Sequence, residues 1–161
     1  MSVTRPPGGA FLADRPEADR PEEDRMHTAQ IIAMRPRVRG NLNAVLLRCI
    51  DECQDCARAC TRSAVACLSE SDVRQLVQCI RLDLDCADLC LAAAALGSRR
   101  TGTNRDILRG MLEICSDGCR ICAEECERHA GRHEHCRTCA DACRRCERAC
   151  RDAASSIGFV H

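Results

Sequence analysis

The sequence CRTCADACRRCERAC at residues 136–150 places a cysteine at every third or fourth position. Because an α-helix takes 3.6 residues per turn, side chains with this spacing lie on one face of a helix. The positions between the cysteines are mostly Arg, Asp, Glu and Ala, which suit the solvent-exposed side. The segment therefore predicts an amphipathic helix whose buried face is lined with thiols.

The same rhythm occurs in three earlier segments of the chain. CIDECQDCARAC occupies residues 49–60, CIRLDLDCADLC occupies residues 79–90, and a further set of cysteines lies at residues 115–126. The predicted helices run from about 41 to 68, from an N-cap within 69–72 to near Gly97, from a capping box at 103–106 to near Gly131, and from about 133 to 156. Four helices of similar length with short connections predict an all-α fold, an antiparallel up-down four-helix bundle with a Cys-lined core.

All seventeen cysteines fall on the four predicted inward stripes. One or two buried cysteines behave as small apolar core residues, but so many on facing stripes indicate a metal-binding interior. The candidate metal ligands are Cys49, Cys53, Cys56, Cys60, Cys67, Cys79, Cys86, Cys90, Cys115, Cys119, Cys122, Cys126, Cys136, Cys139, Cys143, Cys146 and Cys150. Counting outward from each turn predicts the pairs Cys60–Cys79, Cys56–Asp83, Cys53–Cys86, Cys49–Cys90, Cys126–Cys136, Cys122–Cys139 and Cys119–Cys143. These pairs predict one continuous column of sulfur along the bundle axis.

Cysteine takes the place of the large side chains that usually fill a core. The chain of 161 residues has no Trp or Tyr, and its two Phe residues, Phe11 and Phe159, lie near the termini. Such a cysteine content is typical of secreted disulfide scaffolds, but the odd number leaves one thiol unpaired and the N-terminal sequence lacks an apolar signal region. We therefore expect a cytoplasmic protein. Without a membrane-length apolar run and with balanced formal charge, neither a membrane nor a nucleic acid is an expected partner.

The sequence before the bundle has a different character. All five prolines lie within the first 36 residues, and DRPEADRPEEDR at residues 14–25 is a charged near-repeat. We expect residues 1–40 to form a disordered, charged and Pro-rich tail, with a short helix near 28–34, and residues 41–157 to form the Cys-rich bundle. Met26 is a candidate for the true start of translation.

Dense thiolates select soft metal ions, so Cu(I), Zn(II) and iron–sulfur clusters are the candidates. One Cu⁺ per deprotonated cysteine leaves a buried column neutral, whereas a zinc ion with four thiolates keeps a net negative charge. No Arg lies on the cysteine stripes to compensate that charge. The sequence therefore predicts multiple Cu(I) ions per chain, on the order of one per cysteine.

Other chemistries use the same cysteines. CxxC pairs such as CRTC suggest a structural or buffering zinc-binding helical protein, although zinc knuckles need turns where this sequence keeps its helical rhythm. The same pairs suggest a thiol redox protein, but catalysis needs one or two distinguished thiols rather than a uniform lining. The Cys-Pro ending of ferredoxin motifs is absent. We therefore expect Cu(I) sequestration and no enzyme activity.

Two residues interrupt or extend the cysteine pattern along the bundle. Asp83 lies where the rhythm between Cys79 and Cys86 requires a cysteine. An inward carboxylate needs a partner, so Asp83 is a candidate copper ligand or an acceptor of hydrogen bonds from thiols; the alternative is a surface aspartate. Met111 lies four residues before Cys115, and core packing explains it more readily than thioether ligation.

Three histidines are predicted at one end of the bundle. His129 and His133 extend the stripe of the third helix, and His135 opens the fourth. We hypothesise that these imidazoles capture Cu(I) and pass it inward; the alternative is solvated turn histidines. The expected recipients are Cys67, Cys126 and Cys136. The expected apolar plug at the other end comprises Val45, Leu46, Leu108 and Ala153.

Residues 41–156 resemble the cysteine-rich four-helix-bundle copper storage proteins, in particular their cytosolic branch. The most specific segments are CIDECQDCARAC, CIRLDLDCADLC and CAEECERHAGRHEHCRTCADACRRCERAC. The resemblance implies Cu(I) ligation by the matching cysteines and assembly as a homotetramer. It also implies that Asp83, His129, His133 and His135 occupy non-cysteine positions of the core and its mouth.

Overall fold

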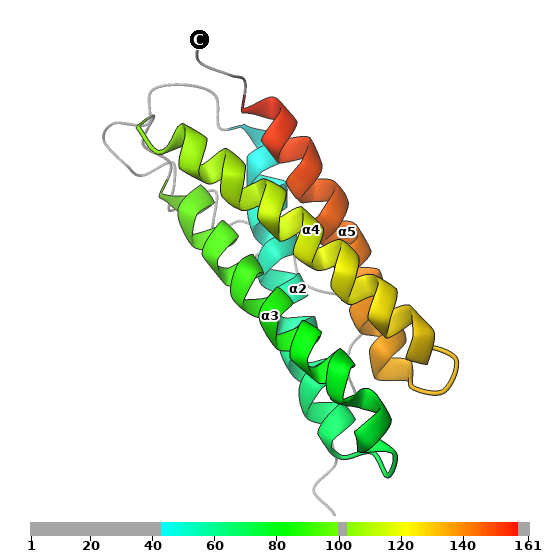
Figure 1. Cartoon of the computed structure of the whole chain (residues 1–161). Helices are drawn as coiled ribbons and strands as arrows, with labels where there is room; N and C mark the ends of the chain where they lie inside the picture. Colours follow the sequence, from blue (N-terminus) through cyan, green and yellow to red (C-terminus); the bar gives the residue numbers. More distant parts are fainter. Residues whose placement is uncertain (1–42, 100–102, 158–161) are drawn as a thin grey trace, which may run out of the picture.

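The computed structural model describes residues 43–99 and 103–157. This part of the chain consists of four helices: α2 (Ala44–Leu68), α3 (Val73–Ser98), α4 (Arg105–His129) and α5 (Glu134–Ser156). They form an antiparallel up-down bundle, as the sequence predicts (Figure 1). The predicted tail at 1–40, with its short helix near 28–34 and Met26, lies outside the described residues.

The helices form a square arrangement in which α2 and α4 each pack against α3 and α5. The tight turns at residues 69–72 and 130–133 lie at the same end of the bundle (Figure 1). We call this the turn end and the other end, where α2 and α4 begin, the opposite end. Within the described residues, none of the helices combines the length and apolarity needed to span a membrane.

Polar residues mark where the helices begin. The Asn43 side chain accepts hydrogen bonds from the backbone N–H groups of Val45 and Leu46, at 3.1 and 3.3 Å, which caps α2. Asp72 holds the N-cap position of α3 within the predicted segment, but its side chain makes no capping hydrogen bond. Asn104 rather than Thr103 is the N-cap residue of α4. The predicted helix starts are therefore correct to within a few residues.

The second helix ends one residue after Gly97, close to the predicted position, but Gly97 does not lie just beyond the helix end as a terminating glycine would. Gly97 lies inside α3 and is buried, and the helix continues to Ser98. A Cβ atom at this position would lie 3.0 Å from Ile50 Cγ1, so a larger residue would have to displace the Ile50 side chain where α2 and α3 approach each other closely. An end-of-helix glycine and a close-packing glycine look alike in the sequence.

The core divides into two parts. Cysteine and alanine line most of its length, while most large buried apolar side chains gather at the opposite end: Leu46, Ile50, Leu108, Leu112 and Ile157. The exception is Leu76, which is fully buried near the turn end. Leu46, Leu108 and Ala153 are buried as predicted for the plug, but Val45 is 41% exposed because it precedes the inward Leu46 by one residue. Met111 is partly buried against the core, in line with the packing interpretation.

Candidate metal centre

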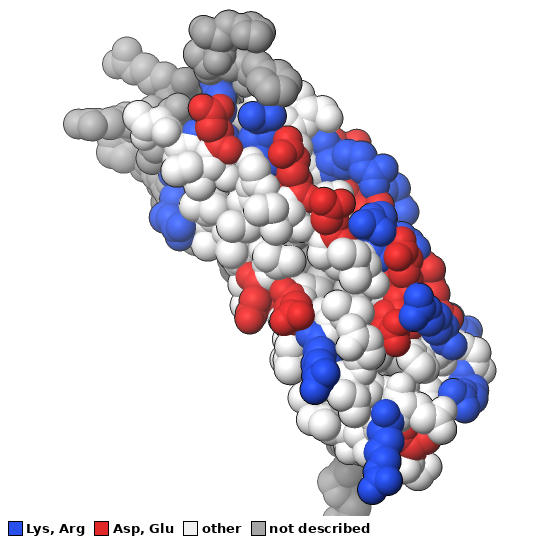
Figure 2. Space-filling model, viewed as in Figure 1, with Lys and Arg blue, Asp and Glu red and all other residues white. Residues whose placement is uncertain are grey.

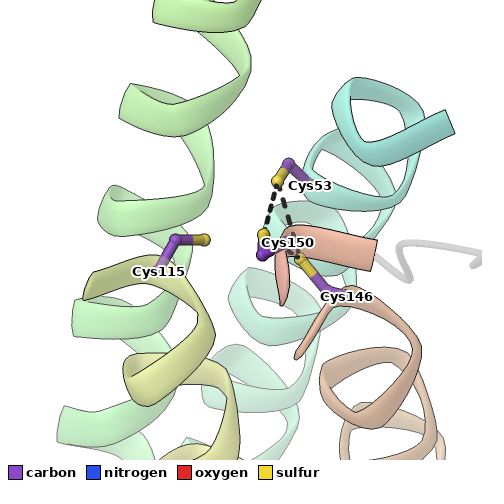
Figure 3. Close-up of side chains that lie close together, drawn as sticks. All are labelled: Cys53, Cys115, Cys146 and Cys150. Atoms are coloured by element: carbon purple, nitrogen blue, oxygen red, sulfur yellow. Dashed lines mark hydrogen bonds between the residues drawn. The ribbon is translucent and has the colours of Figure 1, made fainter. Parts of the chain in front are cut away.

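The thiols line the bundle axis along almost its full length. All seventeen cysteines are buried and none forms a disulfide. Many sulfur atoms lie 3.5–4.0 Å apart, as in Cys53–Cys150 and Cys60–Cys143 at 3.5 Å. Figure 3 shows Cys53, Cys115, Cys146 and Cys150 pointing toward one another from α2, α4 and α5. The helical periodicity has brought residues far apart in sequence into one cluster.

The sulfur atoms form overlapping groups rather than separate sites. In each group the ligand atoms lie within 4.8 Å of one another. The groups include Cys53/Cys115/Cys146/Cys150, Cys56/Cys60/Cys86/Cys143, Cys56/Cys90/Cys119/Cys146, Cys60/Cys122/Cys139/Cys143 and Asp83/Cys122/Cys126/Cys139. Because each of these groups shares at least one cysteine with another, a metal ion in one shares a ligand with a metal ion in the next.

The predicted hairpin register is only partly correct. Cys122 and Cys139 lie in the same group, as expected. Cys56 is grouped with Cys86, whereas the sequence prediction placed it opposite Asp83. The reason is that α2 ends at Leu68 and α3 begins at Val73, which centres the turn one residue later than the prediction assumed. The continuous column does not depend on this difference.

The column carries no fixed positive charge. No Arg is fully buried among the described residues, and the buried ionisable side chains other than cysteine are Asp83, Glu125, His133 and Glu147. Burial raises the pKa of the Cys67 thiol to about 12, since a thiolate loses its hydration there. A bound metal ion must therefore displace thiol protons and supply the positive charge itself.

Asp83 points into the column, which rules out the surface interpretation. Its side chain is fully buried, and Oδ1 accepts hydrogen bonds from the thiols of Cys122, Cys126 and Cys139 at 3.1–3.3 Å. Burial raises its pKa to about 7, with a further contribution from Cys139. Oδ2 is buried without a hydrogen-bond partner. The carboxyl group thus accepts hydrogen bonds from thiols through Oδ1, as predicted, while Oδ2 has none.

The histidines differ in what they contact. His135 Nε2 lies 3.4 Å from the sulfur of Cys67, the last cysteine of α2, and Cys67 in turn contacts Cys136. The ring of His133 lies beside that of His135, with centroids 5.3 Å apart. His129 Nε2 instead lies 3.3 Å from Glu125 Oε1 on its own helix. The structure therefore joins His135 to the thiol column directly.

Two carboxylates at the turn end escaped the sequence analysis. Glu70 and Asp72 appear in the sequence as part of a helix-capping segment, yet both lie against the histidines. Glu70 Oε1 is 3.5 Å from His133 Nδ1, and Asp72 Oδ2 is 3.5 Å from His133 Nε2. The available signal was topological, because an up-down bundle brings the 69–72 and 130–133 turns to the same end.

Comparison with known proteins agrees with this geometry. The model of the copper storage protein family matches residues 42–155. A copper storage protein from Streptomyces lividans loaded with 10 copper equivalents is 46% identical, with a TM-score of 0.74, and the match covers 80% of this chain and 98% of that one. A second structure from S. lividans, a cytosolic copper storage protein with five coppers, is 52% identical, with a TM-score of 0.68 and coverage of 72% and 95%. The Cu(I)-bound copper storage protein BsCsp3 is 39% identical, with a TM-score of 0.58 and coverage of 66% and 94%. The chain belongs to the copper storage protein family.

Proposed function

We propose that this protein stores Cu(I) in the cytosol, binding many ions per chain through its core thiolates. The observation that carries the proposal is the overlap of the four-ligand groups, in which Cys56, Cys60 and Cys143 each belong to two groups. Bridging thiolates let neighbouring Cu(I) ions share ligands, so that capacity approaches one ion per cysteine. The cytosolic location follows that of the S. lividans protein.

Charge supports copper over zinc. Each Cu⁺ replaces one thiol proton, so a loaded column remains neutral. Zinc bound by four thiolates would leave negative charge in a core in which residues 43–99 and 103–157 contribute no buried Arg. The uniform lining also argues against a redox enzyme, because none of the thiols is set apart as an exposed nucleophile. Sequestration without turnover is the function that fits.

The ligand assignment extends the sequence prediction. We assign Cu(I) binding to all seventeen cysteines and a ligand role to Asp83, whose buried carboxyl group lies within 3.3 Å of three of their sulfur atoms. Copper enters at the turn end, where His135 contacts Cys67 and provides a first pair of ligands. The His133 ring lies next to that of His135 and is a further candidate ligand at this end. His129 contacts Glu125 in the metal-free protein and would have to leave this contact to bind copper.

An anaerobic titration of the fully reduced protein with Cu(I), against a competing chromophoric chelator, tests the proposal. We expect tight binding of more than about ten ions per chain, with zinc in a parallel titration saturating at a few. Saturation with copper at only one to four ions would contradict storage and favour a structural-metal or redox role.

We further propose that copies of the chain associate as a homotetramer through an apolar surface on α3 and α4. The exposed large apolar side chains there recur every seven residues: Val77, Leu84 and Leu91 on α3, and Ile107, Ile114 and Ile121 on α4. Figure 2 shows largely uncharged surface over these two helices, with charged side chains concentrated toward α5. A seven-residue apolar repeat on a helix surface is typical of packing against further helices.

The exposed area is large enough to support association. The six side chains are 40–64% exposed, which amounts to apolar surface on the order of 500 Å². A stable interface buries about 800 Å² per partner, and the surrounding residues supply the remainder. Leu84→Glu should reduce the mass measured by light scattering. Val65→Glu on α2, also at an exposed apolar residue, should not; equal masses for both variants would contradict this interface.

A further inference from the structure

A second set of ligand atoms lies outside the thiol column, at the turn end. It joins Glu70, in the turn between α2 and α3, to His133 and His135, at the start of α5. Glu70 Oε1 lies 3.5 Å from His133 Nδ1 and 3.8 Å from His135 Nδ1. Two imidazole nitrogens therefore converge on one carboxylate oxygen.

These separations suit a metal ion. Nitrogen and oxygen ligands lie about 2.0–2.1 Å from zinc, so two ligands in a tetrahedral arrangement are about 3.4 Å apart. The observed 3.5 and 3.8 Å require only a small contraction around an ion. Three protein ligands also leave one coordination position open, as in zinc sites that exchange ligands.

The second ring nitrogen of His133 has the kind of neighbour that a metal-bound imidazole usually has. His133 is only 8% exposed, and its Nε2 lies 3.5 Å from Asp72 Oδ2 without forming a hydrogen bond. A histidine that binds metal through one nitrogen typically donates its other N–H to a carboxylate. Arg132 lies 4.0 Å from the same Asp72 oxygen and helps to hold it. Metal binding at Nδ1 would give the buried Nε2 a defined role as a donor to Asp72.

We propose that Glu70, His133 and His135 bind one borderline divalent ion of the Zn(II) class at the mouth of the thiol column. Imidazole and carboxylate ligands suit borderline ions, whereas Cu(I) prefers the thiolates further in. The negative charges of Glu70 and Asp72 favour a doubly charged ion over a singly charged one. Ligand type and charge thus separate the mouth ion from the stored copper.

The ion would act on copper uptake, an inference that rests on the proposed storage function. It links the turn after α2 to the start of α5, two segments that lie beside Cys67 at the turn end. It also engages His135 through Nδ1, while the Nε2 of the same ring faces the Cys67 sulfur at 3.4 Å. With this ring bound to a divalent ion, its imidazole is no longer free to carry Cu(I) to Cys67, and loading slows.

The binding site can be tested in protein whose thiols are first saturated with Cu(I), so that they do not compete. Co(II) then serves as a spectroscopic substitute for Zn(II). We expect one Co(II) per chain with weak visible bands, no sulfur-to-cobalt charge transfer, and displacement by Zn(II). Glu70→Gln should weaken this binding at least about tenfold, and so should His133→Ala. Glu134→Gln, an exposed carboxylate in the same region that pairs with Arg137, is the matched control and should bind as the wild type does.

A kinetic measurement tests the effect on uptake. Zn(II) should slow Cu(I) loading of the wild type and of Glu134→Gln, but not of Glu70→Gln; zinc bound to column thiols would affect all three proteins equally. Identical behaviour of Glu70→Gln and the wild type, or absence of the cobalt site, would show that Glu70 and His133 form only an ion pair and would overturn the proposal. The final Cu(I) capacity of the same samples tests storage separately, because Glu70 contributes no ligand to the column.

Discussion

Replacing Asp83 by asparagine should change how the stability of the metal-free protein depends on pH. The carboxyl group is fully buried among thiols, and its pKa is raised from 3.8 to about 7, chiefly by burial. In the unfolded chain the same group loses its proton near 3.8. Between these values the folded protein holds one proton more than the unfolded chain, so stability must fall as the pH rises.

The size of the effect follows from the two pKa values. A pKa difference of one corresponds to about 1.4 kcal/mol, so the contribution lost between about pH 4 and pH 8 is on the order of 4 kcal/mol. The contribution is fully present below pH 4, declines through the interval and is constant above the folded pKa. Asparagine has a similar shape and an oxygen that accepts hydrogen bonds from thiols, but it does not titrate.

Urea unfolding of the reduced, metal-free proteins, followed by circular dichroism at several pH values, measures this difference. The stability of the wild type relative to Asp83→Asn should fall by about 4 kcal/mol from pH 4 to pH 8. Asp85→Asn, an exposed carboxylate on the same helix, is the control and should run parallel to the wild type. If Asp83→Asn also runs parallel, the carboxyl group is not held protonated by burial and the reasoning fails.

Four further substitutions probe other parts of the bundle. Cys143→Ser removes a ligand shared by two groups, so Cu(I) titration should show a capacity lower by about one or two ions, and an unchanged capacity would contradict bridging. Gly97→Val places a larger side chain against Ile50 and should lower the free energy of unfolding, measured with denaturant, by about 1–3 kcal/mol. Gly110→Ala, with no neighbour within 4 Å, should instead raise it by about 1 kcal/mol. A neutral Gly97→Val would refute the close approach of α2 and α3. His135→Ala should slow Cu(I) uptake in stopped-flow experiments without changing the final capacity, and an unchanged rate would exclude the handover to the thiols.

The sequence predicted the helices well because two independent signals agreed. The cysteine rhythm identified one face of each helix, and the polar segments at 69–72 and 103–106 gave helix starts that the structure confirms to within a few residues. The error at Gly97 arose because the distance between two helix axes is set by side chains on both, here Ile50 as well as the glycine. The error at Val45 arose because Val45 and Leu46 are both apolar and adjacent. Successive residues point about 100° apart around a helix, so only one of the two can face the core, and the sequence does not say which.

The candidate site was predictable in kind but not in its cross-contacts. Periodicity alone places Asp83 inward, and the structure confirms this. Which thiols meet across the axis depends on turn position, and the shift of Cys56 toward Cys86 shows how sensitive that is. The grouping of Glu70 with His133 joins residues that lie in separate hairpins. No local sequence signal connects them, so only the assembled bundle could show it.

The division of the core explains how the same fold can serve with and without copper. Leu108, Leu112 and Ile157, together with Leu46 and Ile50, bury large apolar side chains at the opposite end and stabilise the bundle independently of metal. The remaining length is lined by small thiols, whose protons Cu⁺ replaces one for one without changing the net charge of the interior. A zinc finger, in contrast, depends on its metal for folding. Because most of the large apolar side chains pack at one end, where they need no metal, the metal-free protein should already be helical, and copper can fill or leave the column without the chain having to fold again.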